Sequence, residues 1–161
     1  ESAMAHVTDI APTLFELAGA KHPGTEYQGK PVLPLRGASM LPLLQGRGQA
    51  VHGADKAIGW ELGGRKALRK GDWKIVSANQ PWGTGDWELF NVAQDRSESR
   101  NLAAANPQKL GEMLVAWRDY VRETGTLEIP NLANRPGYSN GAKYYEDLKY
   151  EATLVPRTAK P

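Results

Sequence analysis

The sequence of 161 residues contains no cysteine. This absence excludes a disulfide framework, a thiolate nucleophile and a cysteine-ligated zinc site, although it names no compartment. Long apolar runs are also absent, and none approaches the roughly 20 residues of a membrane-spanning helix. The 20 basic and 18 acidic residues leave a net charge of only +2. That charge is too small to predict a nucleic-acid partner, so we expect neither nucleic acid nor a membrane span.

Residue sets that carry catalysis are scarce as well. The three histidines form no HxH or HExxH pattern, and "GGRKALRKG" lacks the spacing of a phosphate-binding loop. His6 precedes an expected helix, where a buried or capping histidine is favoured over a metal ligand. His22 and His52 are expected to be surface residues of loops. The sequence therefore predicts no catalytic and no metal-ligating residue in this chain.

The first third of the chain predicts helices and loops. In "VTDIAPTLFELA", residues 7–18, apolar residues recur every three or four positions, as on one face of a helix. Thr8 or Asp9 is the expected N-cap. Residues 20–38 are rich in glycine and proline and are expected to form a loop, and a short helix is expected near 39–45.

The middle of the chain predicts a sheet, and a long helix follows it. Short strand patterns at 56–61, 65–69, 71–76 and 87–92, separated by brief turns, predict an antiparallel meander. Asn106 as N-cap, Pro107 in the first turn and Gly125 at the end bound a helix over 107–124 with one apolar stripe. We expect Ala67, Trp73 and Ile75 to face this helix. The predicted fold class is α+β: a small antiparallel sheet of about four strands packed against a long amphipathic helix.

The stretch "GWELGGRKALRKGDWKIV", residues 59–76, combines aromatic and basic residues. Its strand end supplies three candidates for a substrate rim, Trp60, Glu61 and Arg65, because an aromatic ring beside a carboxylate and a turn suits a pocket for sugar or aryl groups. Core packing is the alternative for Trp60. Trp82 lies in a loop and is a candidate lid residue. Glu61 is expected near Glu88 if their strands are neighbours.

The order of five motifs carries a resemblance to a family. "HVTDIAPTLFELAGA", "LRGASMLPLLQG", "WELGGRKALRKGDWKIV", "WELFNVAQDRSESRNLA" and a helix with "LVAWRDY" follow one another. Over residues 4–125 this order resembles the C-terminal part of the type I sulfatases, in the arylsulfatase branch of the alkaline-phosphatase-like superfamily.

The resemblance implies a sulfate ester hydrolase with a large α/β domain, which holds the active site, and a smaller domain of sheet plus helix. The family uses a formylglycine nucleophile, made in a C/S-x-P-x-R motif, and a calcium ion. This chain has no cysteine and no serine in that pattern, so no catalytic or metal residue is carried over. The resemblance therefore implies a C-terminal fragment that is inactive alone and whose partner is the upstream sulfatase domain.

The implied organisation has three parts. Residues 1–50 are expected to be a remnant of the large domain, 51–125 the sheet and helix, and 126–161 an extended tail. Two alternatives stay open. One is a stand-alone module that binds anionic or sulfated glycans through Trp60, Trp82 and the basic cluster. The other is a relative that hydrolyses phosphate or phosphonate esters.

Overall fold

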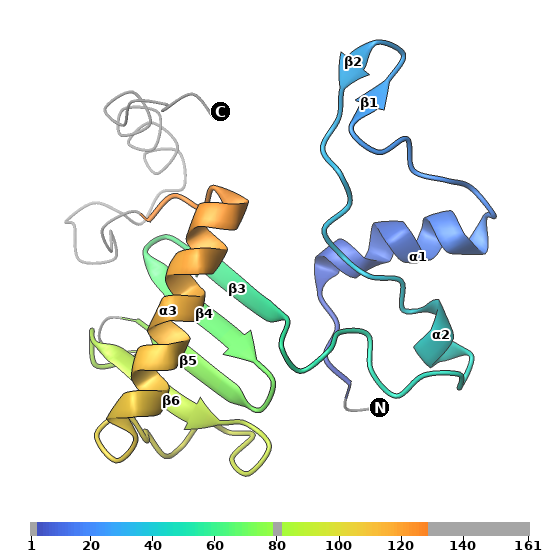
Figure 1. Ribbon diagram of the computed structural model, residues 1–161. Helices are drawn as coiled ribbons and strands as arrows, with labels where there is room; N and C mark the ends of the chain where they lie inside the picture. The colour runs from blue at the N-terminus through green and yellow to red at the C-terminus, as the bar shows by residue number, and fades with distance from the viewer. Residues whose placement is uncertain (1–2, 79–81, 129–161) are drawn as a thin grey trace. The chain divides into compact units, whose positions relative to one another are not determined.

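The computed structural model describes residues 3–78 and 82–128 (Figure 1). The chain divides into two compact units. Among the described residues, the first comprises 3–58 with 69–73, and the second comprises 59–68, 74–78 and 82–128. Most of the expected tail, from residue 129 onward, lies outside the described residues.

The first helix of the chain begins with a short 3-10 turn. Helix η1 (Val7–Asp9) runs directly into α1 (Ile10–Leu17), as the apolar periodicity predicted. The structure has two N-caps: His6 caps η1, which the sequence did not predict, and Asp9 holds the N-cap position of α1, as predicted, although its side chain makes no capping bond there. The His6 backbone N–H donates to Asp9 Oδ2 at 2.7 Å, while the His6 ring accepts from the backbone of Thr8, and the two bonds close a reciprocal cap.

The expected loop over 20–38 contains a small hairpin. Strands β1 (Glu26–Tyr27) and β2 (Lys30–Pro31) pair in antiparallel register. Between them Gln28 and Gly29 have φ values of 51° and 74°, the left-handed conformation that two-residue hairpin turns require. The short helix α2 (Leu41–Leu44) follows, within the range predicted for it.

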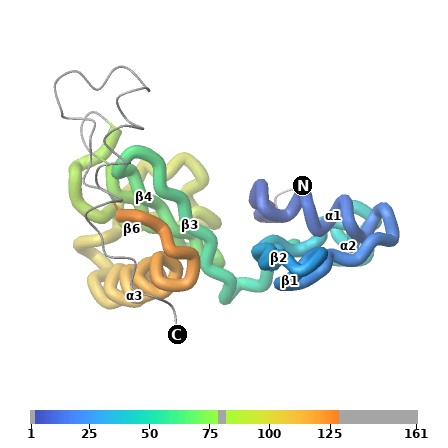
Figure 2. The backbone as a smooth tube through the Cα atoms, turned by 90° about the horizontal axis from the view of Figure 1, so that it is seen from above, coloured from blue at the N-terminus to red at the C-terminus, as the bar shows by residue number. Residues whose placement is uncertain are grey.

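The second unit carries most of a four-stranded antiparallel sheet. Its strands are β3 (Ala57–Leu62), β4 (Arg65–Lys70), β5 (Trp73–Ser77) and β6 (Trp87–Asn91), in the spatial order β3-β4-β5-β6. Helix α3 (Pro107–Thr124) lies against one face of this sheet (Figures 1 and 2). The predicted α+β class, with a small meander and a long helix, is therefore confirmed. Asn106 occupies the N-cap position but its side chain makes no capping bond, and Gly125 ends the helix at φ 68°.

Aromatic side chains join α3 to the sheet. The rings of Trp117 and Trp87 lie 5.5 Å apart, and Tyr120 Oη donates to the backbone carbonyl of Gly59 at 2.8 Å. A Cβ at Gly59 would lie only 2.6 Å from the Tyr120 ring, so only glycine allows this close approach. Leu68, fully buried, completes the core on this side.

The strand β4 presents a different residue to the helix than expected. Lys66 Nζ lies 3.0 Å from Glu128 Oε1, which also accepts a hydrogen bond from Trp117 of α3. Lys66 therefore lies on the helix face, and strand alternation places Leu68 there too. The prediction that Ala67 faces α3 was wrong.

The order of the strands also separates two carboxylates that were expected to be close. Glu61 lies on β3 and Glu88 on β6, at opposite edges of the sheet. The expected pair therefore does not form. Among the described residues, no helix is long and apolar enough to cross a membrane.

Candidate functional site

The described part of the chain offers no metal centre. Within residues 3–78 and 82–128, no three histidine, cysteine, aspartate or glutamate side chains gather in a way that could hold a metal ion. The residues present in these ranges therefore do not fit a calcium ion.

The predicted rim residues Trp60 and Glu61 point to opposite faces of the sheet. Gly59 approaches Tyr120 of α3, so alternation along β3 places Trp60 on the face away from α3 and Glu61 on the helix side. Glu61 Oε1 accepts a hydrogen bond of 2.7 Å from the backbone N–H of Gly64. Glu61 thus closes the β3–β4 turn.

Arg65 lies on the same open face as Trp60, because its neighbour Lys66 points to the helix side. The guanidinium carbon of Arg65 lies 3.9 Å from the centroid of the Trp82 ring, which is a close cation–π contact. The Trp82 side chain remains 63% exposed. The structure thus brings Arg65 together with the loop tryptophan, a pairing that no local pattern in the sequence indicates.

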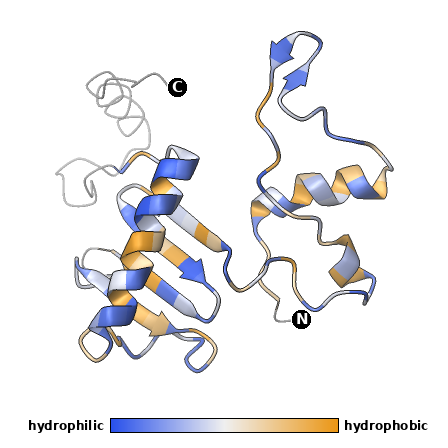
Figure 3. Cartoon of the chain, viewed as in Figure 1, coloured by the Kyte–Doolittle hydropathy of each residue, from blue (hydrophilic) through white to orange (hydrophobic). Residues whose placement is uncertain are grey.

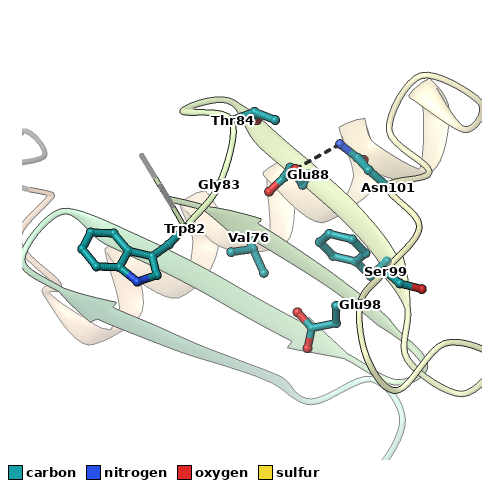
Figure 4. A pocket seen from close by; sticks show the side chains of 9 residues that line it. Val76, Trp82, Gly83, Thr84, Glu88, Glu98, Ser99 and Asn101 are labelled. Atoms are coloured by element: carbon teal, nitrogen blue, oxygen red, sulfur yellow. Dashed lines mark hydrogen bonds between the residues drawn. The ribbon is translucent and has the colours of Figure 1, made fainter. Parts of the chain in front are cut away.

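A pocket of about 410 Å³ opens on this face of the sheet (Figure 4). Val76 of β5 and Phe90 of β6 contribute apolar surface to it. Its walls come from the loop at 82–84 and from the connector at 98–101. Sequence analysis missed this pocket, because its two walls belong to segments that are separated by strand β6.

The connector that forms one wall is held in shape by Asp95. This carboxylate accepts hydrogen bonds from the Ser97 and Ser99 hydroxyls and from the backbone N–H of Arg100. The Arg100 bond, with the serine bonds, holds the pKa of Asp95 below its ordinary value despite the opposing effect of desolvation. The connector ends at Asn101, whose Oδ1 accepts from the backbone N–H of Leu89 on β6 at 3.1 Å.

The first unit contains a buried ionisable pair. Asp9, with no exposed surface, accepts a hydrogen bond from His52 Nε2 at 2.8 Å and another from the Ala38 backbone N–H at 2.9 Å. The His52 side chain is only 9% exposed, so the expectation of a surface histidine was wrong. Burial raises the pKa of Asp9, but the bonds from His6, Ala38 and His52 together bring that pKa below its ordinary value.

Neighbouring residues complete a structural role for this pair. Thr13, 4% exposed, donates from its hydroxyl to the carbonyl of Asp9 and accepts from the backbone N–H of Met40. A Cβ at Gly37 would lie 2.1 Å from the carbonyl oxygen of Thr8, so the backbones touch there. The motifs around Asp9 and Gly37 therefore fasten two loops to α1.

Comparison with known proteins assigns the family by sequence. No protein-family model matches the chain. An uncharacterized sulfatase of Schizosaccharomyces pombe is 36% identical over 140 residues, which are 86% of this chain and 25% of that protein. Arylsulfatase K of Danio rerio is 30% identical over 71% of this chain and 22% of its own length. A sulfatase of Formosa agariphila is 28% identical, with 70% and 22% covered.

Solved structures agree on the fold. The crystal structure of Ps i-CgsB superposes with a TM-score of 0.60 at 24% identity, covering 97% of this chain and 30% of that one. Its complex with k-i-k-neocarrahexaose gives 0.53 at 27% identity, covering 92% and 29%. The chain spans about a quarter of the length of the curated relatives it matches. The chain therefore belongs to the sulfatases, as the order of its motifs predicted, and represents a part of such a protein.

Proposed function

We propose that the chain is the C-terminal portion of an arylsulfatase-like sulfate ester hydrolase, that it braces the active site and forms part of its rim, and that it is inactive alone. The observation that supports this proposal most strongly is the exposed apolar stripe of the first helix. Its members share one face of η1 and α1 and are between 50% and 70% exposed: Val7, Ile10, Leu14 and Leu17. Hydrophobic residues along α1 are visible in Figure 3.

An exposed stripe of this size favours a missing partner surface. Soluble proteins rarely expose contiguous apolar patches beyond a few hundred Å² unless another surface covers them. Curated relatives are about four times as long as the segment they share with this chain. We assign the stripe to the upstream part of the parent protein, the large domain that the resemblance implies.

That upstream part would also supply the chemistry. The resemblance implies a formylglycine nucleophile and calcium in the complete enzyme, and the sequence of this chain contains no residue pattern from which either site can be built. This chain would instead supply part of the surface and a positive charge at the rim of the active site. Arg65, held against Trp82, carries a positive charge that favours an anionic sulfate ester.

A glycan sulfate ester is the substrate class that we propose. One structural neighbour is Ps i-CgsB in complex with k-i-k-neocarrahexaose, and its sequence is 27% identical to that of this chain. An aromatic ring beside a guanidinium on an open sheet face also suits an anionic sugar.

The test is a comparison of turnover of 4-nitrophenyl sulfate by residues 1–161 and by the complete parent protein, with 4-nitrophenyl phosphate as the competing substrate. We expect sulfate turnover by the parent and none by the chain alone. Sulfate turnover by the chain alone, or a parent that cleaves only the phosphate, would overturn the proposal.

A second experiment addresses the apolar stripe. The double substitution Leu14→Asp and Leu17→Asp places charges where the upstream domain should pack, so the parent should lose stability or activity. The isolated chain should keep its fold, because both side chains are exposed there. Leu33→Asp is the matched control, since Leu33 is 87% exposed in a loop. Equal tolerance of all substitutions in the parent would rule out this packing.

One observation favours a second function, a glycan-binding module. Arg65 and Trp82 form a cation–aromatic pair on the open face, and Trp60 on the same face is 39% exposed. Titration of the chain with heparin hexasaccharide at low and high salt tests it. Salt-sensitive binding that Arg65→Gln weakens supports the module, and an absence of binding rejects it.

A further inference from the structure

We propose that the pocket on the open face of the sheet, lined by Val76, Trp82, Glu88, Phe90, Glu98 and Asn101 among others, binds a neutral, hydroxyl-rich saccharide unit. Its volume of about 410 Å³ lies within the roughly 300–1,000 Å³ of small-molecule sites. The pocket lies within the second unit, on the side of the sheet that α3 does not cover (Figure 4).

The pocket provides the apolar surfaces that a sugar ring needs. Phe90 is 6% exposed and Val76 half-buried, and both side chains line the pocket from neighbouring strands. Trp82 stands at the rim with 63% of its side chain exposed. The carbon-bound hydrogens of a pyranose pack well against an indole face, because the ring is flat, polarisable and only weakly hydrated. Arg65 holds this indole in place through its cation–π contact.

Polar groups on the opposite wall match sugar hydroxyls. Asn101 Oδ1 accepts from the backbone N–H groups of Leu89 and Ala103, which fixes the orientation of the amide. Asn101 Nδ2 is thereby directed toward Glu88 Oε1, at 3.5 Å (Figure 4). That separation is at the outer limit of a hydrogen bond. A ligand hydroxyl can accept from Nδ2 and donate to the Glu88 carboxylate at little cost to the protein.

The second carboxylate of the pocket is pre-positioned. Glu98 has φ 54°, the left-handed conformation that non-glycine residues rarely adopt. Its Oε1 forms an ion pair of 2.6 Å with Lys74 Nζ on β5. Residues held in such a conformation concentrate at functional sites, where the surrounding structure holds them. Glu98 therefore presents its carboxylate at the pocket with little freedom left to lose on binding.

The charges of the lining select against an anionic ligand. The lining contains two carboxylates, Glu88 and Glu98, and no lysine or arginine. Lys74 is already paired with Glu98. A sulfate group inside the pocket would face Glu88 without a neutralising cation, and like charges at such distances repel. The pocket thus suits an uncharged sugar, while Arg65 outside it suits the sulfate of a neighbouring unit.

This inference deepens the proposed function, on which it rests for the connection with sulfate esters. A glycan with alternating neutral and sulfated units would place a neutral unit in the pocket and a sulfated unit beside Arg65. The pocket would then contribute to the choice of glycan and not to the hydrolytic step. Binding to the pocket can therefore be measured without turnover.

The test is isothermal titration of residues 1–161 with neutral hexasaccharides (cellohexaose, xylohexaose and mannohexaose) and with heparin hexasaccharide. We expect at least one neutral hexasaccharide to bind with little dependence on salt. Trp82→Ala and Glu88→Ala should each weaken that binding about tenfold or more, since each removes a principal contact. Tyr27→Ala is the control, because Tyr27 is an aromatic residue that is 56% exposed and lies outside the pocket lining, and this variant should bind as the unaltered chain does.

The outcomes separate this proposal from the proposed function. Failure of all three neutral sugars to bind, or binding that neither pocket variant weakens, overturns the pocket proposal. Preference for the heparin fragment, abolished by salt, overturns it as well. Turnover of 4-nitrophenyl sulfate by the complete parent is measured in parallel. Retained turnover in the Glu88→Ala parent leaves the proposed function intact whichever way the sugar titrations fall, and loss of that turnover in the folded variant overturns a pure binding role.

Discussion

His52 Nε2 lies 2.8 Å from Asp9 Oδ2, with Asp9 fully buried and the His52 side chain 9% exposed, although 43 positions separate the two residues in the chain. The bond fastens the loop that precedes β3 to the first turn of η1. Three further hydrogen bonds form at the start of α1. The backbone N–H groups of His6 and Ala38 donate to Asp9, and the backbone N–H of Met40 donates to Thr13. The start of α1 is therefore an anchor for two loops, and its conspicuous motif is explained by structure rather than by catalysis.

Substitution of Asp9 should destabilise the first unit. In Asp9→Ala the backbone donors and the buried His52 lose their shared acceptor, and removing one partner of a buried pair costs about 3–5 kcal/mol. Asp9→Asn keeps one acceptor oxygen and should cost less. Urea unfolding and hydrogen exchange of residues 37–52 measure both effects. His22→Ala is the control, because His22 lies in a loop, where its ring contacts the edge of Phe15 and accepts a hydrogen bond from the backbone N–H of Gly24. Equal stability of Asp9→Ala and the control would contradict the anchor.

Stability should depend on pH through Asp9. The pKa of Asp9 in the folded protein lies below its ordinary value of 3.8: burial raises it, but hydrogen bonds from His6, Ala38 and His52 outweigh burial. Its contribution to the free energy of unfolding is therefore complete above the unfolded pKa and is lost as the pH falls through the folded pKa. Urea midpoints measured from neutral to strongly acid pH check this. The decline should be shallower in Asp9→Asn, and an identical decline would refute the assignment.

Local signals in the sequence were sufficient for most elements of the fold. Pro107 and Gly125 bound α3 at the predicted residues because fixed φ in the first turn and a left-handed residue after the last are local requirements. Short turns between strands predicted the meander for the same reason. The β1–β2 hairpin was missed because its two-residue strands lack any alternation to detect, and because Gln28 is not one of the residues (Asn, Asp or Gly) that favour the first position of a two-residue turn.

Contacts between residues far apart in the chain could not be predicted from the sequence. Asp9 with His52, and Arg65 with Trp82, meet only after folding, and neither pair lies at a spacing that a helix or strand would bring together. In β4 the adjacent apolar residues Ala67 and Leu68 left two registers open. The larger side chain should have decided the register, because burying Leu68 removes more apolar surface from water. The role proposed for Arg65 remains a prediction.

Two glycines should respond in opposite directions to the same substitution. Gly59→Ala places a Cβ 2.6 Å from the Tyr120 ring, so the ring must shift and its bond to the Gly59 carbonyl weakens. Overpacking of this kind costs about 1–3 kcal/mol. Gly111→Ala, on α3 with no atom within 4 Å of the new Cβ, should gain about 0.5–1 kcal/mol of helix stability.

Thermal and urea unfolding of the two variants give the comparison. Because the same chemical change is made in both, effects on the unfolded chain largely cancel. The double variant Gly59→Ala with Tyr120→Leu should recover part of the loss, since the smaller side chain relieves the clash. A stabilising Gly59→Ala would show that α3 does not approach β3 as closely as the structure has it.

Substitutions of Glu128 should change the stability of the protein mainly through its hydrogen bond with the indole of Trp117. Trp117, 2% exposed, donates from Nε1 to Glu128 Oε1 at 2.9 Å, and Lys66 Nζ lies 3.0 Å from the same oxygen. Glu128→Gln keeps an acceptor for the indole and loses only a partly exposed ion pair, which is worth about 0–1 kcal/mol. Glu128→Ala leaves a buried N–H without its acceptor and should cost about 1–3 kcal/mol.

Tryptophan fluorescence during urea unfolding separates the two costs, because Trp117 sits at the α3–sheet contact beside Trp87. The hydrogen bond from Trp117, followed by the contact with Lys66, also holds the pKa of Glu128 below its ordinary value against the effect of burial. The stability that Glu128 contributes is therefore present above its unfolded pKa and is lost as the pH falls through the lower folded value. Lys66→Met should reproduce the Gln variant and not the Ala variant. If Lys66→Met costs as much as Glu128→Ala, the ion pair and not the indole bond fixes the end of α3.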